Sequence, residues 1–209
     1  MISIRLENAG KRFGSEWIFR NLNMDLTAAL PLAILGGNGS GKSTLIKSLL
    51  GYSTLTEGNM IVERDGALLK ADQFYKTLSF CSPYLELYEE LTITEVVDFH
   101  FGLKPLKTGV SRKSFLEIIY LEHSANKAIK QLSSGMKQRL RLGLALLSDT
   151  EVVLLDEPTS NLDSKGVAWY KQLMVNYSTD RCIAVASNHL EAEYSFCTQI
   201  LEIDTFKPS

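Results

Sequence analysis

Residues 32–43 read LAILGGNGSGKS, and this stretch joins an unbroken apolar run to a glycine cluster that ends in lysine and serine. An apolar run without polar alternation is typical of a strand that is buried on both faces of a parallel sheet. Residues 44–50, TLIKSLL, favour a helix that Gly51 would end. The sequence therefore predicts a strand, a glycine-rich loop and a helix in that order.

The glycine cluster at residues 36–43 matches the pattern G-x-x-x-x-G-K-S/T at every fixed position. Glycines let consecutive backbone N–H groups converge on phosphates, and the following helix directs the positive end of its dipole toward them. We expect the Lys42 ammonium to pair with phosphate oxygens of ATP and the Ser43 hydroxyl to bind Mg²⁺. The predicted nucleotide-binding residues of this loop are Gly36, Gly37, Asn38, Gly39, Ser40, Gly41, Lys42, Ser43 and Thr44. Kinases, GTPases, helicases and transport ATPases all carry such a loop.

The composition narrows the class of protein. The 209 residues, 45% hydrophobic and 22% charged, fit one globular domain or two closely joined lobes. A formal net charge of -2 gives no overall electrostatic reason to bind nucleic acid, so no nucleic-acid partner is expected. The longest apolar runs fall short of the ~20 residues of a membrane helix, so we expect any membrane span in another chain. Cys81, Cys182 and Cys197 lack metal-type spacing and are expected to be reduced thiols.

A second motif, VVLLDE at residues 152–157, brings two acids to the end of an apolar strand. Such acids are stable at the carboxyl edge of a sheet when they meet a cation and a reacting group. We predict that Asp156, with Ser43, holds Mg²⁺ and that Glu157 polarises the attacking water. This pair favours hydrolysis over phosphoryl transfer to a small substrate.

The remainder of the chain alternates between strand and helix patterns. The predicted strands are 2–6, 17–19, 22–26, 78–81, 151–155, 182–186 and 198–203, with a hairpin turn at 65–66. Helical patterns cover 92–130, 134–147, 164–176 and 189–193. Strands that alternate with helices predict a parallel α/β sheet, and the central helical block has the character of an insertion.

A third motif carries a resemblance to a known family. Residues 131–139 read QLSSGMKQR and resemble the LSGGQ signature of the ATP-binding cassette (ABC) ATPases, with Ser134 in place of a glycine and Met136 in place of the glutamine. Downstream, SNLD at 160–163 resembles the family's D-loop, and SNH at 187–189 resembles the segment of its switch histidine. The order and spacing of these motifs extend the resemblance over nearly all of the 209 residues.

The resemblance implies an α/β fold: a P-loop NTPase (RecA-like) core with an N-terminal antiparallel β subdomain and an inserted α-helical subdomain. Residues 1–209 would form one nucleotide-binding domain. Within it, residues 1–84 and 148–209 would make up the catalytic core with the β subdomain, and residues 85–147 the helical subdomain.

In the family, the signature contacts the ATP that is held by a second subunit, so the resemblance implies a head-to-tail dimer, homomeric or heteromeric. The residues that would contact the partner's nucleotide are Ser133, Ser134, Gly135 and Met136. Ser133 and Ser134 are good N-caps, so the start of their helix is a second anion site. Asp163 would couple the two sites, and His189 would contact the γ-phosphate, although a lone histidine at a helix start is more often a cap or core residue.

Phe13 lies upstream of the glycine loop, where the family places an aromatic residue that stacks on adenine. Stacking of a base on an aromatic ring contributes ~1–3 kcal/mol. Core packing is the alternative role for Phe13, and Trp17 is the competing candidate for the stacking role.

The resemblance implies ATP hydrolysis that powers transport through separate membrane subunits, with the chain on the cytoplasmic side at the inner face of the cell membrane. The bare length of one cassette favours an exporter over the importers that carry a C-terminal regulatory domain. The alternative is a soluble ABC-type ATPase that acts on the ribosome or on nucleic acid.

Residues 79–92, SFCSPYLELYEELT, fall where the family has its Q-loop, in which a glutamine reaches Mg²⁺ and the attacking water. Pro83 occupies the glutamine position, and proline offers neither a side-chain ligand nor an N–H donor. Either water or a neighbour such as Ser82 would then complete the metal shell, or the coupling between the metal and the helical subdomain is weaker in this chain. The tyrosines and glutamates from Pro83 to Glu90 are expected to receive the membrane permease subunits.

Overall fold

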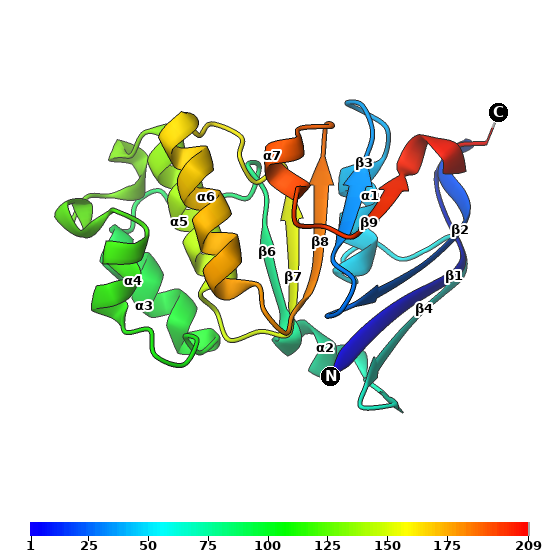
Figure 1. The fold of residues 1–209 in the computed structure, drawn as a ribbon, viewed down its shortest axis with the longest axis horizontal. Coiled ribbons are helices and arrows are strands. Elements are labelled where there is room, and N and C mark those ends of the chain that lie inside the picture. The colour runs from blue at the N-terminus through cyan, green and yellow to red at the C-terminus, as the bar shows by residue number, and fades with distance from the viewer. Residues whose placement is uncertain (209) are drawn as a thin grey trace.

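A computed structural model gives the fold of the chain and describes residues 1–208 (Figure 1). It contains a four-stranded antiparallel sheet, with the order β2-β1-β4-β5, and a five-stranded sheet, with the order β6-β7-β8-β3-β9. The strands are β1 (Ile2–Phe13), β2 (Glu16–Thr27), β3 (Leu32–Leu35), β4 (Glu57–Arg64), β5 (Ala67–Leu68), β6 (Leu78–Cys81), β7 (Val152–Asp156), β8 (Cys182–Ser187) and β9 (Gln199–Glu202). The helices are α1 (Lys42–Leu49), α2 (Ala71–Thr77), α3 (Ile93–Leu103), α4 (Arg112–Ile118), α5 (Ser134–Leu146), α6 (Ser164–Tyr177) and α7 (Glu191–Tyr194).

The five-stranded sheet is parallel throughout, as the alternating pattern predicts. Every residue of β3, β7 and β8 is buried, which explains their continuous apolar sequences. Parallel strands end at the same edge of a sheet, so the segments that follow β3, β7 and β8 lie at one edge. This edge brings together the glycine loop, the two acids and the segment that contains His189.

The antiparallel sheet covers one side of the parallel sheet, and the helices α3 to α6 lie on the other side (Figure 1). One buried cluster fills the space between the two sheets, and a second lies under the helices. The predicted hairpin turn is confirmed, because Asp65 and Gly66 both have positive φ, as the two-residue hairpin turn requires. The separately predicted strands 17–19 and 22–26 form a single strand, β2.

Three helices, α3, α4 and α5, lie between β6 and β7, where the sequence predicts an inserted helical block. Thr92 caps α3 in a capping box with Glu95, and Ser111 caps α4. The division of the chain at residues 84–85 and 147–148 stays a prediction.

One helix is missed and another is misplaced. The sequence analysis does not predict α2, because its seven residues are too few to give a clear helical period. The helix expected over 189–193 begins only at Glu191, because His189 has φ 56 and cannot continue a right-handed helix. Across residues 1–208, none of the helices has the length and apolar character needed to cross a bilayer.

Candidate active site

The glycine loop leads directly from β3 into α1, as predicted. Gly41 has φ 108, and a Cβ atom there would lie 2.5 Å from the Cγ2 atom of Ile18, so only glycine fits. The N–H groups of the first turn of α1 have no partners within the helix, and an anion at this end would accept from them.

Lys42 is only 4% exposed and folds back over the loop. Its Nζ atom donates to the carbonyl oxygens of Gly36 and Gly37, at 2.8 and 2.9 Å. The ammonium group is therefore held inside the arch of the loop, next to the first turn of α1, where we predict that the phosphates bind.

Asp156 ends β7 and is 3% exposed, and its Oδ1 atom has no hydrogen-bond partner among the described residues. Burial raises the pKa of Asp156, and a hydrogen bond with Ser43 partly offsets this effect. A buried carboxylate oxygen without a donor, beside a serine hydroxyl, provides the oxygen ligands that Mg²⁺ prefers. The residues present therefore fit the predicted metal.

Glu157 lies one residue beyond Asp156 and has φ 43, a left-handed conformation that is rare outside glycine. Its backbone N–H donates to the carbonyl oxygen of Ala186 on β8 at 2.9 Å. Its Oε2 atom accepts from the Ser160 hydroxyl at 3.4 Å, and the side chain is half-buried. The backbone is thus fixed to the sheet while the carboxylate keeps access to solvent.

His189 follows β8, also with a left-handed backbone, φ 56. Its side chain is 53% exposed, and its Nε2 atom lies 3.9 Å from the Oε2 atom of Glu202. The preceding residue, Asn188, donates from Nδ2 to the Oδ1 atom of Asn38 in the glycine loop, at 3.4 Å. The histidine segment and the phosphate loop are therefore in contact, and the role of His189 stays a prediction.

The two aromatic candidates for adenine stacking differ in how free their rings are. The guanidinium groups of Arg12 and Arg20 lie 5.3 and 4.5 Å from the ring centroid of Trp17. Phe13 is 55% exposed, and the Lys11 ammonium lies 4.9 Å from its ring centroid. The ring of Phe13 is therefore more available to a base than that of Trp17.

The signature and the D-loop meet at a hollow of about 400 Å³. Ser133 is the N-cap of α5 and accepts from the Met136 N–H at 3.2 Å, whereas Ser134 is the first residue of the helix. Asp163 caps α6 through the Gly166 N–H at 2.7 Å. The residues that line the hollow are Ser133, Ser134, Gly135, Met136, Arg139, Asn161, Leu162 and Asp163. Arg139 and Asn161 lie within the quoted signature and D-loop segments, but the sequence interpretation gave neither of them a role.

Ser82 and Pro83 follow β6, where the family resemblance expects a glutamine. Ser82 is 5% exposed and lines a cavity of about 650 Å³ together with Ser43 and Asp156. Within residues 1–208, no glutamine or asparagine side chain lines this cavity. Ser82 thus shares one cavity with the two candidate metal residues.

The buried carboxylate, the enclosed lysine and the glycine loop before a helix are the features of a P-loop nucleotide hydrolase. A family model described as ABC transporter matches residues 19–160. The chain therefore belongs to the ABC transporter family and is an ATP-hydrolysing cassette of a transporter, as the sequence predicts.

Relatives match along most of the chain. The lantibiotic transport ATP-binding protein SrtF of Streptococcus pyogenes is 28% identical over 203 residues, which cover 91% of this chain and 81% of that protein. The Nod factor export ATP-binding protein I of Rhizobium sp. is 27% identical, over 97% of this chain and 68% of that protein. The sulfate/thiosulfate import ATP-binding protein CysA of Synechocystis sp. is 32% identical, over 78% of this chain and 47% of that protein.

Solved structures share the fold. The cassette MJ0796, in a dimeric post-hydrolysis state with ADP and Pi, is 26% identical, with a TM-score of 0.77 over 96% of this chain and 95% of that one. A Pyrococcus furiosus ABC transporter ATP-binding protein has a TM-score of 0.81 at 16% identity, over 99% of this chain and 100% of that one. The predicted fold class is thereby confirmed.

Proposed function

We propose that this cassette pairs head to tail with a second cassette, binds two ATP molecules between them, and powers export through separate membrane subunits. The hollow that joins Ser133 and Gly135 to Asp163 carries this proposal, because it offers a second anion site that the chain's own phosphate loop does not line. The dimeric state of MJ0796 supports the same arrangement.

In this proposal, the loop residues and Lys42 hold the triphosphate, and the site fixes its terminal phosphate near Glu157. Ser43 and Asp156 would hold Mg²⁺, which when bound neutralises charge on the phosphate oxygens. The Glu157 carboxylate orients a water and takes its proton, since its backbone is fixed and its oxygens reach solvent. Ser82, which lines the same cavity as Asp156, takes the place of the glutamine in this proposal.

Mixed dimers test the head-to-tail arrangement. Lys42→Ala disables the phosphate loop, and Gly135→Asp places a negative charge at the signature; each homodimer should lose ATP hydrolysis. In a one-to-one mixture, half of the dimers contain one site with an intact loop and an intact signature, so activity should return in part. Failure of the mixture to regain activity, when both variants fold and form dimers, would refute the arrangement.

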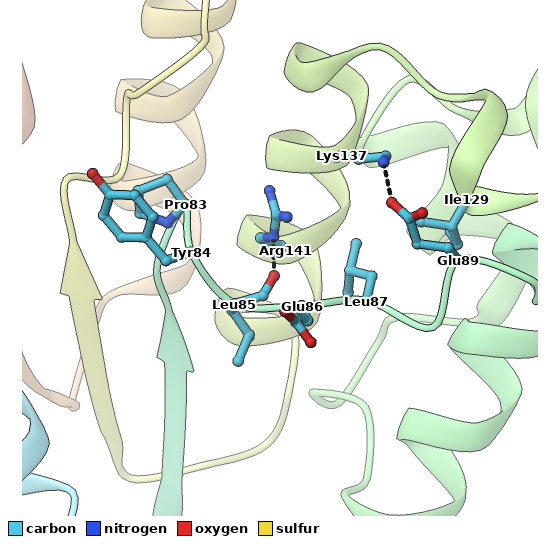
Figure 2. A pocket seen from close by; sticks show the side chains of 9 residues that line it. All are labelled: Pro83, Tyr84, Leu85, Glu86, Leu87, Glu89, Ile129, Lys137 and Arg141. Atoms are coloured by element: carbon cyan, nitrogen blue, oxygen red, sulfur yellow. Dashed lines mark hydrogen bonds and ion pairs between the residues drawn. The ribbon is translucent and has the colours of Figure 1, made fainter.

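The segment from Pro83 to Glu90 is our proposed docking site for the membrane subunits, and it lies over α5 at a pocket of about 420 Å³ (Figure 2). Arg141 donates from Nε to the carbonyl oxygen of Leu85 at 2.7 Å. Lys137 pairs with Glu89 at 2.8 Å. These bonds attach an irregular segment to α5, the helix that begins at the signature. A movement of the segment on docking would therefore be transmitted to the signature.

Two aromatic side chains in this segment remain open to a partner. Tyr84 is 81% exposed and Tyr88 is 67% exposed, whereas Leu87 packs against the core under the helices. Exposed aromatic residues among paired charges are typical of a binding surface. We therefore expect the docking surface to consist of the two tyrosines and their acidic neighbours.

The docking proposal places the cassette at the inner face of the cell membrane. Tyr88→Asp should abolish retention on membranes that contain the permease and have been stripped of peripheral proteins, while ATP hydrolysis by the isolated cassette is unchanged. Val175→Asp, on the exposed face of α6, is the matched control and should bind normally. Equal retention of both variants would remove the segment from docking.

The Nod factor relative supports the export direction, and ATP-dependent loading of substrate into inverted vesicles containing the permease would contradict an import role.

A further inference from the structure

Glu193 on α7 is a buried carboxylate without a cationic partner among the described residues. Only 3% of the residue is exposed. Its Oε1 atom accepts from the backbone N–H and the hydroxyl of Thr159, at 3.0 and 2.7 Å, and its Oε2 atom accepts from the Ser187 hydroxyl at 2.5 Å. A buried carboxylate is stable only when it is paired or hydrogen-bonded, so donors from two separate segments hold this one.

These two segments carry the proposed catalytic residues. Thr159 lies two residues after Glu157, and Ser187 lies two residues before His189. The Ser187 hydroxyl also accepts from the Leu190 N–H at 3.1 Å, which closes the turn around His189. One carboxylate therefore links the segment after β7 to the last residue of β8, next to the turn that contains His189.

Both proposed catalytic residues have strained backbones. Glu157 has φ 43 and His189 has φ 56, and neither is a glycine. Such conformations persist when the surrounding structure fixes them, and they cluster at functional sites. The bonds of Glu193 restrain both segments within two residues of the strained positions.

The position of Glu193 is itself fixed from outside the site. The hydroxyl of Tyr170, on α6, donates to the carbonyl oxygen of Glu193 at 2.8 Å, and Tyr170 is fully buried. The Glu193 N–H donates to the carbonyl oxygen of Leu190 at 2.9 Å. The packing of α6 thus places the carboxylate without help from a nucleotide.

We propose that Glu193 is a positioning residue, which sets the Glu157 and His189 segments relative to each other for ATP hydrolysis. The inference rests on the proposed roles of Glu157 and His189. Glu193 does not reach the nucleotide, so it acts on the rate of the chemical step through the geometry of these two segments and leaves ATP binding intact.

Glu193→Gln keeps the side-chain shape but turns one acceptor into a donor, so the side chain can no longer accept from both segments. We expect kcat to fall about 10- to 100-fold, the size of effect that small misplacement of reacting groups produces, with KM and the ATP dissociation constant within about twofold of wild type. Ser187→Ala removes the bond to Glu193 and the bond from the Leu190 N–H but keeps both Thr159 bonds, so it should lower kcat less. Glu191→Gln, an exposed neighbour on the same helix, should leave both constants unchanged.

Hydrogen exchange separates a local effect on the two segments from a general loss of stability. Residues 157–163 and 187–190 should both exchange faster in Glu193→Gln, while β1 and β2 exchange as in wild type. A variant with normal kcat and a lower melting temperature would overturn the positioning role. If Glu157→Gln and His189→Ala are themselves fully active, the proposed catalytic roles fail instead, whatever Glu193 does.

Discussion

The two edges of the parallel sheet treat their polar groups in opposite ways. At the edge where the strands end, the Oδ1 atom of Asp156 and the Oγ atom of Ser40 are buried without hydrogen-bond partners among the described residues. At the edge where they begin, Arg181 is also buried, at 3% exposed, but each of its guanidinium nitrogens donates hydrogen bonds. The first edge is left open to a ligand, and at the second, the closed edge, the chain itself satisfies the buried Arg181.

Arg181 shows how the closed edge is built. Its nitrogens donate to the carbonyl oxygens of Leu146 and Thr150 at 2.7 Å, of Ser148 at 3.1 Å and of Tyr177 at 3.3 Å. Leu146 and Tyr177 are the last residues of α5 and α6, so the cation meets the negative ends of two helix dipoles. Burial lowers the pKa of Arg181 to about 10, so the group stays charged at neutral pH.

The comparison indicates that the residues that stabilise this sheet and the residues proposed to act in ATP hydrolysis lie at opposite edges of it. Open polar groups lower the stability of the empty protein, and they are the groups that a nucleotide and its metal would satisfy. In Figure 1, α7 follows β8 at the open edge, and α2 leads into β6 at the closed edge. Substitutions at the open edge should therefore change the reaction, and substitutions at the closed edge should change stability.

The largest effect is expected from Glu157→Gln. The variant should bind ATP as wild type does but hydrolyse it about 10²- to 10⁴-fold more slowly, because a general base usually contributes that much. Single-turnover hydrolysis and ATP titration separate the two steps. Glu117→Gln, an exposed glutamate on α4, is the control. Near-normal turnover of Glu157→Gln would remove this residue from the role.

Arg181→Met tests the closed edge. It leaves several buried carbonyls without donors, so the free energy of unfolding should fall by roughly 3 kcal/mol or more, since each buried group left unpaired costs about 1–3 kcal/mol. The rate of hydrolysis per folded molecule should not change. Urea unfolding measures the free energy of unfolding, and an active-site titration gives the number of folded molecules by which the hydrolysis rate is divided. The exposed Lys171→Met is the control. A wild-type midpoint would mean that the Arg181 network adds nothing to stability.

A smaller effect is expected from removing the aromatic ring that we propose to stack on adenine. Phe13→Ala should weaken ATP binding about 5- to 150-fold, which corresponds to the ~1–3 kcal/mol of one stacked base. Binding of inorganic tripolyphosphate, which has no base, should be unaffected. Trp17→Ala is the comparison, because the two arginines already cover its ring. The reverse ranking of the two variants would assign the stacking role to Trp17.

The sequence predicts the parts of this molecule that depend on local pattern. The apolar runs before the glycine loop and before Asp156 locate β3 and β7, and the motifs bring most proposed site residues to one edge. The burial of Glu193 could not be predicted, because the local sequence EAEY is typical of a solvent-exposed helix. Its buried contacts come from Thr159 and Tyr170, which are distant in the sequence. The burial of Arg181 could not be predicted for the same reason, since its partners come from the ends of two separate helices.

Asp156→Asn tests the contrast between the edges most directly. Burial raises the folded-state pKa of Asp156 above its ordinary value of 3.8, so the folded chain holds this proton more tightly than the unfolded chain does. The contribution of Asp156 to stability is therefore greatest below pH 3.8, and it falls as the pH rises to the raised pKa. Asp156→Asn has no such charge, so its free energy of unfolding relative to wild type should increase over that pH window and stay higher at pH 7.

The measurement is urea unfolding of wild type and Asp156→Asn without nucleotide or Mg²⁺, from pH 4 to pH 7. The account predicts that the variant is the more stable protein at pH 7, that its advantage shrinks toward pH 4, and that Mg²⁺ with ATP stabilises wild type more than it stabilises the variant. A variant that is less stable than wild type at pH 7, or a difference that does not depend on pH, would contradict the claim that the open edge is held ready for its ligand at the expense of stability.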